Sequence, residues 1–172
     1  FNPQESVTHL TDWVVDMASN GEEFAEITRL TETFSEFPRI DDRFTGRKCR
    51  YTWGLEVDFN RPIDAVGGSA GGAPMNCLFL KDMETGAESH WWAGSTSTLQ
   101  EPCFVPRSKS VPEGDGWIVQ VCNRLDEHRS DLLIFDALDI EKGPVATIRV
   151  PIRLRFGLHG NWANADEIGL AA

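Results

Sequence analysis

The chain has 172 residues, of which 41% are hydrophobic and 25% charged, a balance typical of a globular domain and not of intrinsic disorder. Its formal net charge of -11 disfavours nucleic acid and anionic membrane surfaces as partners, because their phosphates would repel the protein. The longest apolar runs, such as Leu132–Phe135, are too short to cross a bilayer, so we expect no transmembrane span.

Strand signals separated by turn residues recur along the chain. Three units share an apolar strand with an Asp at its end, a turn that contains Gly, and a second strand: Trp13–Ile27, Leu78–Trp92 and Leu133–Ile148. Between them, Cys49–Val57 alternates apolar with polar residues or glycine, which predicts a half-buried strand with an aromatic inner face. Further single strands are predicted at 117–121 and 146–150, a mobile loop at Gly67–Gly72, and one helical turn at Ala163–Ile168.

Hairpins that recur at these intervals favour a β-propeller, with a β-sandwich of ordinary hairpins as the alternative. Three units are too few to close a propeller, which needs at least four blades. A set of three blades would also leave strand edges exposed. We therefore predict an all-β chain that forms part, about three blades, of a larger propeller ring.

The four cysteines form no CxxC pair, so a zinc site built from them is not expected; they are Cys49, Cys77, Cys103 and Cys122. We expect them to be buried reduced thiols. No signal-peptide pattern opens the sequence, and we expect a cytoplasmic protein.

One of the four histidines has a distinctive setting. Gly157 and Gly160 bracket the Leu158-His159 pair, and glycines allow the backbone to approach a crowded site closely. His159 is therefore a candidate metal ligand or catalytic residue, with a packed core histidine as the alternative. The remaining histidines, which we expect to be surface or packing residues, are His9, His90 and His128.

Two glutamates, Glu36 and Glu101, lie beside apolar residues and a proline at predicted strand entrances. A buried carboxylate needs a partner, and an imidazole N–H is a good one. The alternative for both is a salt bridge to Arg39 or Arg107.

Several segments together resemble one protein family. They appear in order as Glu36–Asp41, Ser89–Gly94, Glu101–Arg107, Glu113–Gly116, Ser130–Ala137 and Leu158–Ala163. This pattern resembles the C-terminal part of the carotenoid cleavage oxygenases. Within that family it is most similar to the lignostilbene dioxygenase branch, which includes isoeugenol- and resveratrol-cleaving relatives.

The resemblance implies a seven-bladed propeller with a non-haem Fe(II) on its axis, held by four histidines that are supported by three glutamates. By motif, His159 corresponds to the last iron ligand. Glu36 and Glu101 correspond to two of the carboxylates that accept hydrogen bonds from ligating imidazoles. The other three histidines and the third glutamate are expected in an upstream N-terminal segment, so that residues 1–172 are the C-terminal portion of a single oxygenase domain.

For function, the resemblance implies a dioxygenase that uses O2 and Fe(II) to cleave the C=C bond of a stilbenoid or phenylpropenoid, a small hydrophobic phenolic alkene, to aromatic aldehydes. This chain would supply only part of the active site. The alternatives are cleavage of a carotenoid or apocarotenoid, and a metal-free propeller fragment that acts as a binding or structural module.

Overall fold

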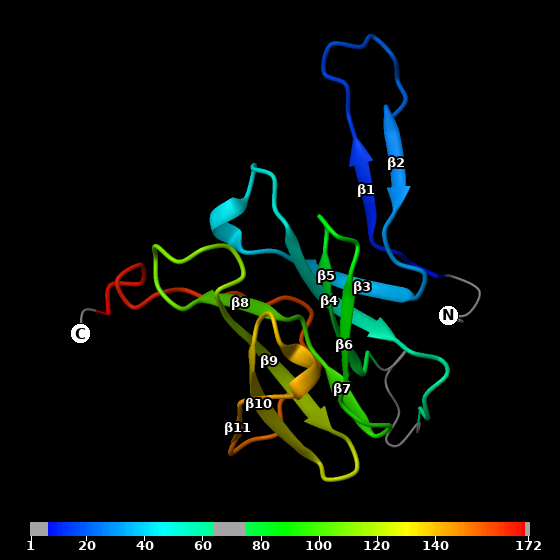
Figure 1. Cartoon of the computed structure of the whole chain (residues 1–172). Helices are drawn as coiled ribbons and strands as arrows, with labels where there is room; N and C mark the ends of the chain where they lie inside the picture. The colour runs from blue at the N-terminus through cyan, green and yellow to red at the C-terminus, as the bar shows by residue number, and fades with distance from the viewer. Residues whose placement is uncertain (1–6, 64–74, 171–172) are drawn as a thin grey trace.

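The computed structural model describes residues 7–63 and 75–170, and regular structure within these ranges is almost entirely β (Figure 1). The loop predicted at Gly67–Gly72 lies outside the described residues. The strands are β1 (Thr11–Val14), β2 (Glu26–Arg29), β3 (Phe34–Arg39), β4 (Tyr51–Val57), β5 (Cys77–Asp82), β6 (Glu88–Trp92), β7 (Ser97–Leu99), β8 (Cys103–Pro106), β9 (Gly116–Arg124), β10 (Arg129–Asp136) and β11 (Ala146–Arg149). Two 3-10 helices, η1 (Asp42–Phe44) and η2 (Ile140–Lys142), lie in the connections.

The strands of the described ranges form three antiparallel sheets. β1 and β2 form a hairpin, β3–β4–β5–β6 form a four-stranded sheet, and β7 to β11 form a five-stranded sheet around β9 and β10. The three hairpins predicted from the sequence are confirmed as β1–β2, β5–β6 and β10–β11. The all-β prediction is therefore confirmed, and the first of the three sheets consists of a hairpin alone.

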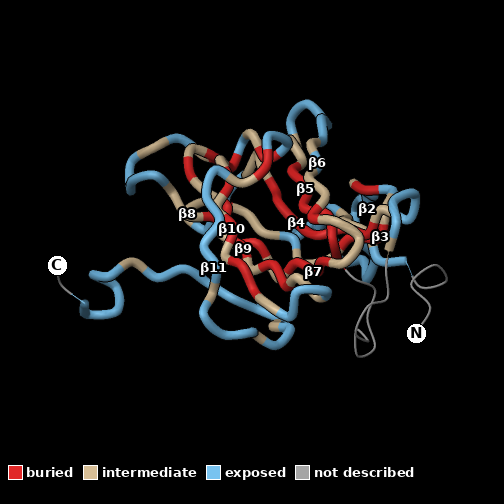
Figure 2. Tube along the Cα trace, turned by 90° about the horizontal axis from the view of Figure 1, so that it is seen from below, coloured by how far each residue is buried: buried red, intermediate tan, exposed pale blue. Residues whose placement is uncertain are grey.

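The core lies between the two larger sheets, where the buried segments of β4, β5, β9 and β10 converge (Figure 2). Trp53 of β4 is fully buried, stacks on Phe104 with a centroid distance of 5.0 Å, and donates from its indole N–H to the Ala137 carbonyl at 2.8 Å. Full burial of large apolar side chains such as Leu55 and Phe135 contributes about 1.5–3 kcal/mol each to folding. This core fixes how the two sheets face each other.

Strand β4 is buried on both faces, which the sequence pattern did not predict. The alternation of apolar and polar residues indicates that one face is exposed to solvent. Thr52 and Glu56 lie on that face, yet both are buried, as is Leu55 on the opposite face. The strand also starts at Tyr51 and not at Cys49. At this end of the strand, the amides of Arg50 and Tyr51 both donate to the Glu113 side chain, at 2.7 Å and 3.0 Å.

The segment predicted to hold a helical turn, Ala163–Ile168, contains turns but no helix. Only the amide of Ile168 makes an α-type hydrogen bond, to the Asn164 carbonyl at 3.3 Å, and the amide of Leu170 reaches back five residues. One turn without a continuing ladder or a buried face does not stabilise a helix.

The four cysteines are unpaired, as expected, but only Cys77 and Cys122 are buried, whereas Cys49 and Cys103 are partly exposed. Desolvation by burial raises the pKa of the Cys122 thiol to about 11, which keeps it protonated at neutral pH.

Across residues 7–63 and 75–170, the structure contains no helix with the length and apolar character needed to span a membrane.

Candidate metal-ligand site

A bulge at the end of β3 shapes one side of the site. The register with β4 shifts between Glu36 and Arg39, because three steps along β3 oppose two steps along β4. Phe37 lies within this bulge and has a φ of 54°, in the left-handed region that is costly for a bulky residue. Its ring contacts that of His159 edge-on, with the ring centroids 5.8 Å apart.

Glu101 lies in the short connection between β7 and β8, and its side chain is only 8% exposed. Its Oε2 atom accepts a hydrogen bond from the Gly160 amide at 2.8 Å, and its Oε1 atom lies 3.4 Å from Nδ1 of His159. The same Oε1 atom lies 3.6 Å from the guanidinium of Arg39. The buried carboxylate is thus supported by a backbone amide, an imidazole and a cation.

His159 lies in the irregular segment that follows β11, and its side chain is 78% exposed. The segment packs closely on Gln100, whose side-chain amide donates to the Arg155 carbonyl at 3.1 Å. A Cβ atom at Gly157 would lie 2.7 Å from the Gln100 side-chain oxygen, which confirms that this glycine permits a close approach. The same expectation is wrong for Gly160, because a Cβ atom there would meet nothing within 4 Å.

The Glu101–His159 pair has the arrangement that a metal-binding imidazole requires. With the hydrogen on Nδ1, the ring donates to the carboxylate and keeps the lone pair of Nε2 for a metal ion. The Nδ1–Oε1 distance of 3.4 Å is long for a hydrogen bond, and the exposed ring is open to a ligand. A shallow pocket borders the pair and is lined in part by Cys103, Val119 and Leu132.

Glu36 is not part of this cluster. It is half-buried, and its carboxylate accepts a hydrogen bond from the Thr8 hydroxyl at 3.1 Å. Of the three predicted site residues, the structure therefore brings Glu101 and His159 together and leaves Glu36 with a different partner.

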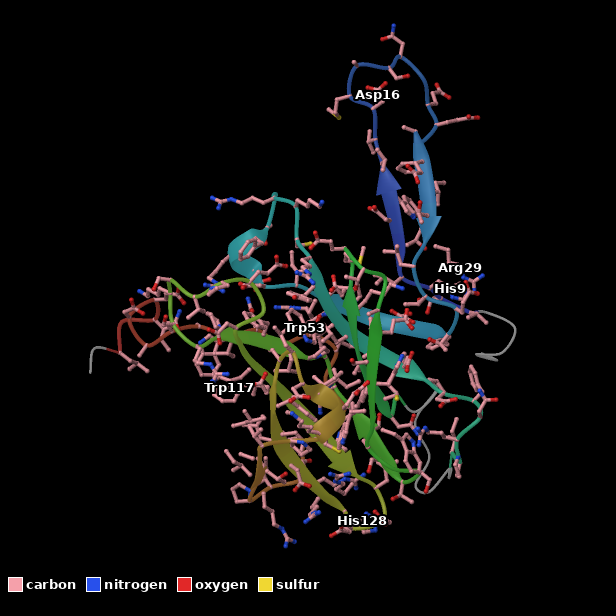
Figure 3. All side chains as sticks on the ribbon, viewed as in Figure 1. His9, Asp16, Arg29, Trp53, Trp117 and His128 are labelled. Carbon is pink, nitrogen blue, oxygen red and sulfur yellow. The ribbon has the colours of Figure 1, made fainter. Side chains whose placement is uncertain are left out.

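The residues present fit one metal ligand and its supporting carboxylate, but not a complete site. Within residues 7–63 and 75–170, no three His, Cys, Asp or Glu side chains converge so that they could hold a metal ion. Figure 3 shows His9 near the base of the β1–β2 hairpin and His128 at the far end of the five-stranded sheet, well apart from each other.

The alternative salt bridges predicted from the sequence have mixed outcomes. Arg39 does approach Glu101, at 3.6 Å, in addition to the contact that Glu101 makes with His159. Arg107 does not pair with Glu101; it pairs with Asp115 at 2.8 Å and Asp136 at 3.0 Å.

A second carboxylate–imidazole pair was missed by the sequence reasoning. His90 on β6 places Nδ1 2.5 Å from the buried carboxylate of Glu56 on β4, and Thr33 donates to the same carboxylate at 2.7 Å. The hydrogen bond to Glu56 raises the pKa of His90, against the opposing effect of burial. Burial tends to raise the pKa of Glu56, but the hydrogen bonds from His90 and Thr33 outweigh it, so that the pKa is lowered. No sequence pattern signalled this pair, because the alternation in β4 predicts that Glu56 is exposed, whereas the structure buries it.

Comparison with known proteins identifies consistent relatives. Residues 1–164 match the family model described as retinal pigment epithelial membrane protein. The chain is 44% identical over 172 residues to the lignostilbene-alpha,beta-dioxygenase isozyme III of Sphingomonas paucimobilis, covering all of this chain and 35% of that protein. It is 43% identical over 162 residues to an isoeugenol monooxygenase of Pseudomonas nitroreducens, covering 94% of this chain and 34% of that protein.

Solved structures agree with these relatives. The lignostilbene dioxygenase of Pseudomonas brassicacearum superposes with a TM-score of 0.81 at 38% identity, covering 88% of this chain and 31% of that chain. The cobalt-substituted apocarotenoid oxygenase of Synechocystis superposes with a TM-score of 0.69 at 32% identity, covering 80% of this chain and 27% of that chain. These propeller structures confirm the predicted fold class. The chain spans about a third of the length of the curated relatives that it matches.

Proposed function

Because this chain belongs to the carotenoid cleavage oxygenases, the family of the retinal pigment epithelial membrane protein, we propose that it is the C-terminal portion of a single-domain Fe(II)-dependent dioxygenase. The observation that carries the proposal is the buried Glu101 carboxylate, which contacts both Nδ1 of His159 and the Gly160 amide. A purely structural or binding module has no evident need for an exposed imidazole oriented in this way.

In this proposal His159 binds the iron through Nε2, and Glu101 fixes the ring orientation by accepting the Nδ1 hydrogen. The edge of Phe37 limits ring rotation from the side of β3. When bound, Fe(II) in an all-imidazole site supplies open coordination positions for O2.

The other three histidine ligands and the third glutamate belong, in this proposal, to an upstream N-terminal segment, because the chain covers only about a third of its relatives' length. Glu36 then accepts a hydrogen bond from one of those upstream imidazoles. Its half-buried carboxylate has one described partner, the Thr8 hydroxyl, and retains acceptor capacity for a second.

The proposed substrate is a small phenolic alkene of the stilbenoid or phenylpropenoid class, which O2 cleaves at the C=C bond to two carbonyl products. The names of the lignostilbene- and isoeugenol-oxidising relatives support this class. The similarity to an apocarotenoid oxygenase makes an apocarotenoid the second candidate. A cytoplasmic location stays a prediction.

The test is His159→Ala in the complete protein, with His128→Ala as the control, because His128 lies in the β9–β10 turn far from the site. We expect His159→Ala to lose iron, measured by elemental analysis, and to lose cleavage of a 4-hydroxystilbene to aldehydes, while its circular dichroism is unchanged. The control variant keeps both. Wild-type iron content and turnover in His159→Ala would refute the ligand assignment, and iron-dependent cleavage of an apocarotenal alone would change the substrate class.

A further inference from the structure

The Arg39 guanidinium connects the end of β3 to the segment that follows β11 and to the β7–β8 connection. Its Nη1 donates to the Gly160 carbonyl at 3.2 Å and lies 3.6 Å from Oε1 of Glu101. Its Nη2 donates to the Asn161 side-chain oxygen at 3.1 Å and lies 3.3 Å from a carboxylate oxygen of Asp42. The side chain is only 17% exposed, although it carries a permanent charge.

The segment that Arg39 contacts has little support of its own. Residues 157–164 lie outside any strand or helix, so that side chains from elsewhere must fix their backbone. Gln100 and Glu101 hold the segment from the β7–β8 connection, through the Arg155 carbonyl and the Gly160 amide. Arg39 holds it from the opposite side, at the end of β3.

Arg39 and Glu101 both hydrogen-bond to the backbone of Gly160, one at its carbonyl and the other at its amide. The Gly160 amide donates to Glu101, and the Gly160 carbonyl accepts from Arg39, so that rotation of this residue would break both hydrogen bonds. The Arg39 guanidinium also lies 3.6 Å from Oε1 of the buried Glu101, so that the two side chains that hold Gly160 contact each other.

We propose that Arg39 is the positioning residue that holds the His159 segment, and with it the imidazole, in the orientation required to bind a metal ion. This inference rests on the proposed function, because it assigns Arg39 a part in metal binding. The planar guanidinium makes these contacts through two nitrogens at once. A lysine ammonium carries its charge on one nitrogen and cannot make both hydrogen bonds in the same geometry.

The first experiment is a Co(II) titration of the complete protein, followed by visible absorption of the bound ion. We expect Arg39→Gln to weaken Co(II) binding about 10–100-fold, the range typical for loss of a residue that orients a metal ligand. Arg39→Lys should recover only a small part of this loss. The matched control is Arg107→Gln, because Arg107 also bridges two carboxylates, Asp115 and Asp136, but makes no described contact with the site.

The second experiment needs no metal. The Gly160 amide donates to Glu101, and the Trp162 amide donates to the Asn161 side-chain oxygen that Arg39 contacts. Hydrogen exchange of these two amides in the metal-free protein should be at least several-fold faster in Arg39→Gln and in Arg39→Lys than in the wild type, because the segment loses its contacts with β3. Exchange in β9 and β10, which hold the core, should be unchanged, and this comparison separates local loosening from global unfolding. Arg107→Gln should exchange like the wild type at both amides.

The outcomes separate the two proposals. A wild-type protein that binds no Co(II) or Fe(II) refutes the proposed function, whereas faster exchange in the Arg39 variants would still support the positioning of the segment. Wild-type Co(II) affinity together with wild-type exchange at Gly160 in both Arg39 variants would overturn the inference. A third check is Glu101→Gln combined with Arg39→Gln: residues that act through one segment should give a double variant whose loss of affinity is smaller than the product of the two single losses.

Discussion

The Glu101 carboxylate holds the backbone of the candidate ligand segment more tightly than it holds the imidazole. Its contact with the Gly160 amide is 2.8 Å long, whereas its contact with His159 is 3.4 Å long. A metal ion on Nε2 makes the Nδ1 hydrogen more acidic and strengthens its bond to a carboxylate. In the proposed site, the segment would therefore be positioned before a metal ion binds to His159, and the contact between the ring and the carboxylate would strengthen on binding.

The Glu56–His90 pair predicts a specific pH dependence of stability. The pKa of His90 is raised above 6.5, chiefly by its hydrogen bond to Glu56, so its contribution is complete below about pH 6.5 and is lost as the pH rises through the folded-state value. The pKa of Glu56 is lowered from 4.5 despite burial, because His90 and Thr33 donate to it. Its contribution is complete above about pH 4.5 and is lost as the pH falls through the folded-state value. The pair therefore stabilises most between about pH 4.5 and 6.5.

His90→Gln in the complete protein tests this assignment. We expect the urea midpoint to fall in the variant at pH 5.5, and the difference from the wild type to shrink steadily as the pH is raised toward 9. Glu88 also lies near the ring, 3.5 Å from Nε2, so Glu88→Gln should reproduce only a small part of the effect. A difference that is constant from pH 5.5 to pH 9 would show that His90 acts by packing and not by charge.

Strand β4 depends on Gly54 at its centre. A Cβ atom there would lie 2.6 Å from the ring of Phe79, which is buried and cannot move freely, and 3.2 Å from the Glu36 carbonyl. Gly54→Ala should therefore destabilise the protein by about 1–3 kcal/mol through overpacking, measured from the urea midpoint. Gly21→Ala is the control, because its nearest atom is the Ser19 hydroxyl of an exposed turn. An unchanged midpoint in Gly54→Ala would mean that β3 and β5 can separate without cost.

Sequence analysis predicted best the hairpins whose connections contain Gly: residues 83–87 join β5 to β6, and the longer segment 15–25 joins β1 to β2. The turns at Asn20-Gly21 and Thr85-Gly86 are local signals, and both hairpins form as expected. The ends of β3 and β8 carry Pro38 and Pro106, which obscure a strand pattern, so that these elements appeared only as strand entrances. Burial on both faces of β4 depends on what packs against it, which no alternation pattern reports.

At the scale of the whole molecule, the candidate site also shows what a sequence pattern does not predict, which is contacts between distant segments. Glu101 and His159 were predicted by chemistry and motif, and Arg39 only as one of two alternative salt-bridge partners, whereas its hydrogen bond to Gly160 joins residues 121 apart in sequence. Phe37 adopts its left-handed backbone only because the bulge and the facing strand impose it. Contacts over such separations follow from the packing of the two sheets, and a single sequence carries no direct signal for them.

The outermost strands leave apolar side chains and strand edges open, which predicts how the 172-residue chain behaves by itself. Trp13 and Ile27 on the hairpin and Ile148 on β11 are more than half exposed, and in the described ranges β11 pairs only with β10. Open edges with apolar side chains promote association. We expect the isolated chain to associate in a concentration-dependent manner, measured by sedimentation velocity, whereas further blades would cover these surfaces in the proposed complete protein.

Ile148→Lys separates edge pairing from general hydrophobicity in this experiment. A lysine on an edge strand opposes strand pairing, so this variant of the isolated chain should associate less. Met17→Lys serves as the control, because Met17 is 90% exposed but lies in the β1–β2 turn and not on a strand edge. Equal effects of both variants would attribute association to exposed apolar surface alone. A folded, monodisperse monomer of the unsubstituted chain would argue against its being part of a larger ring.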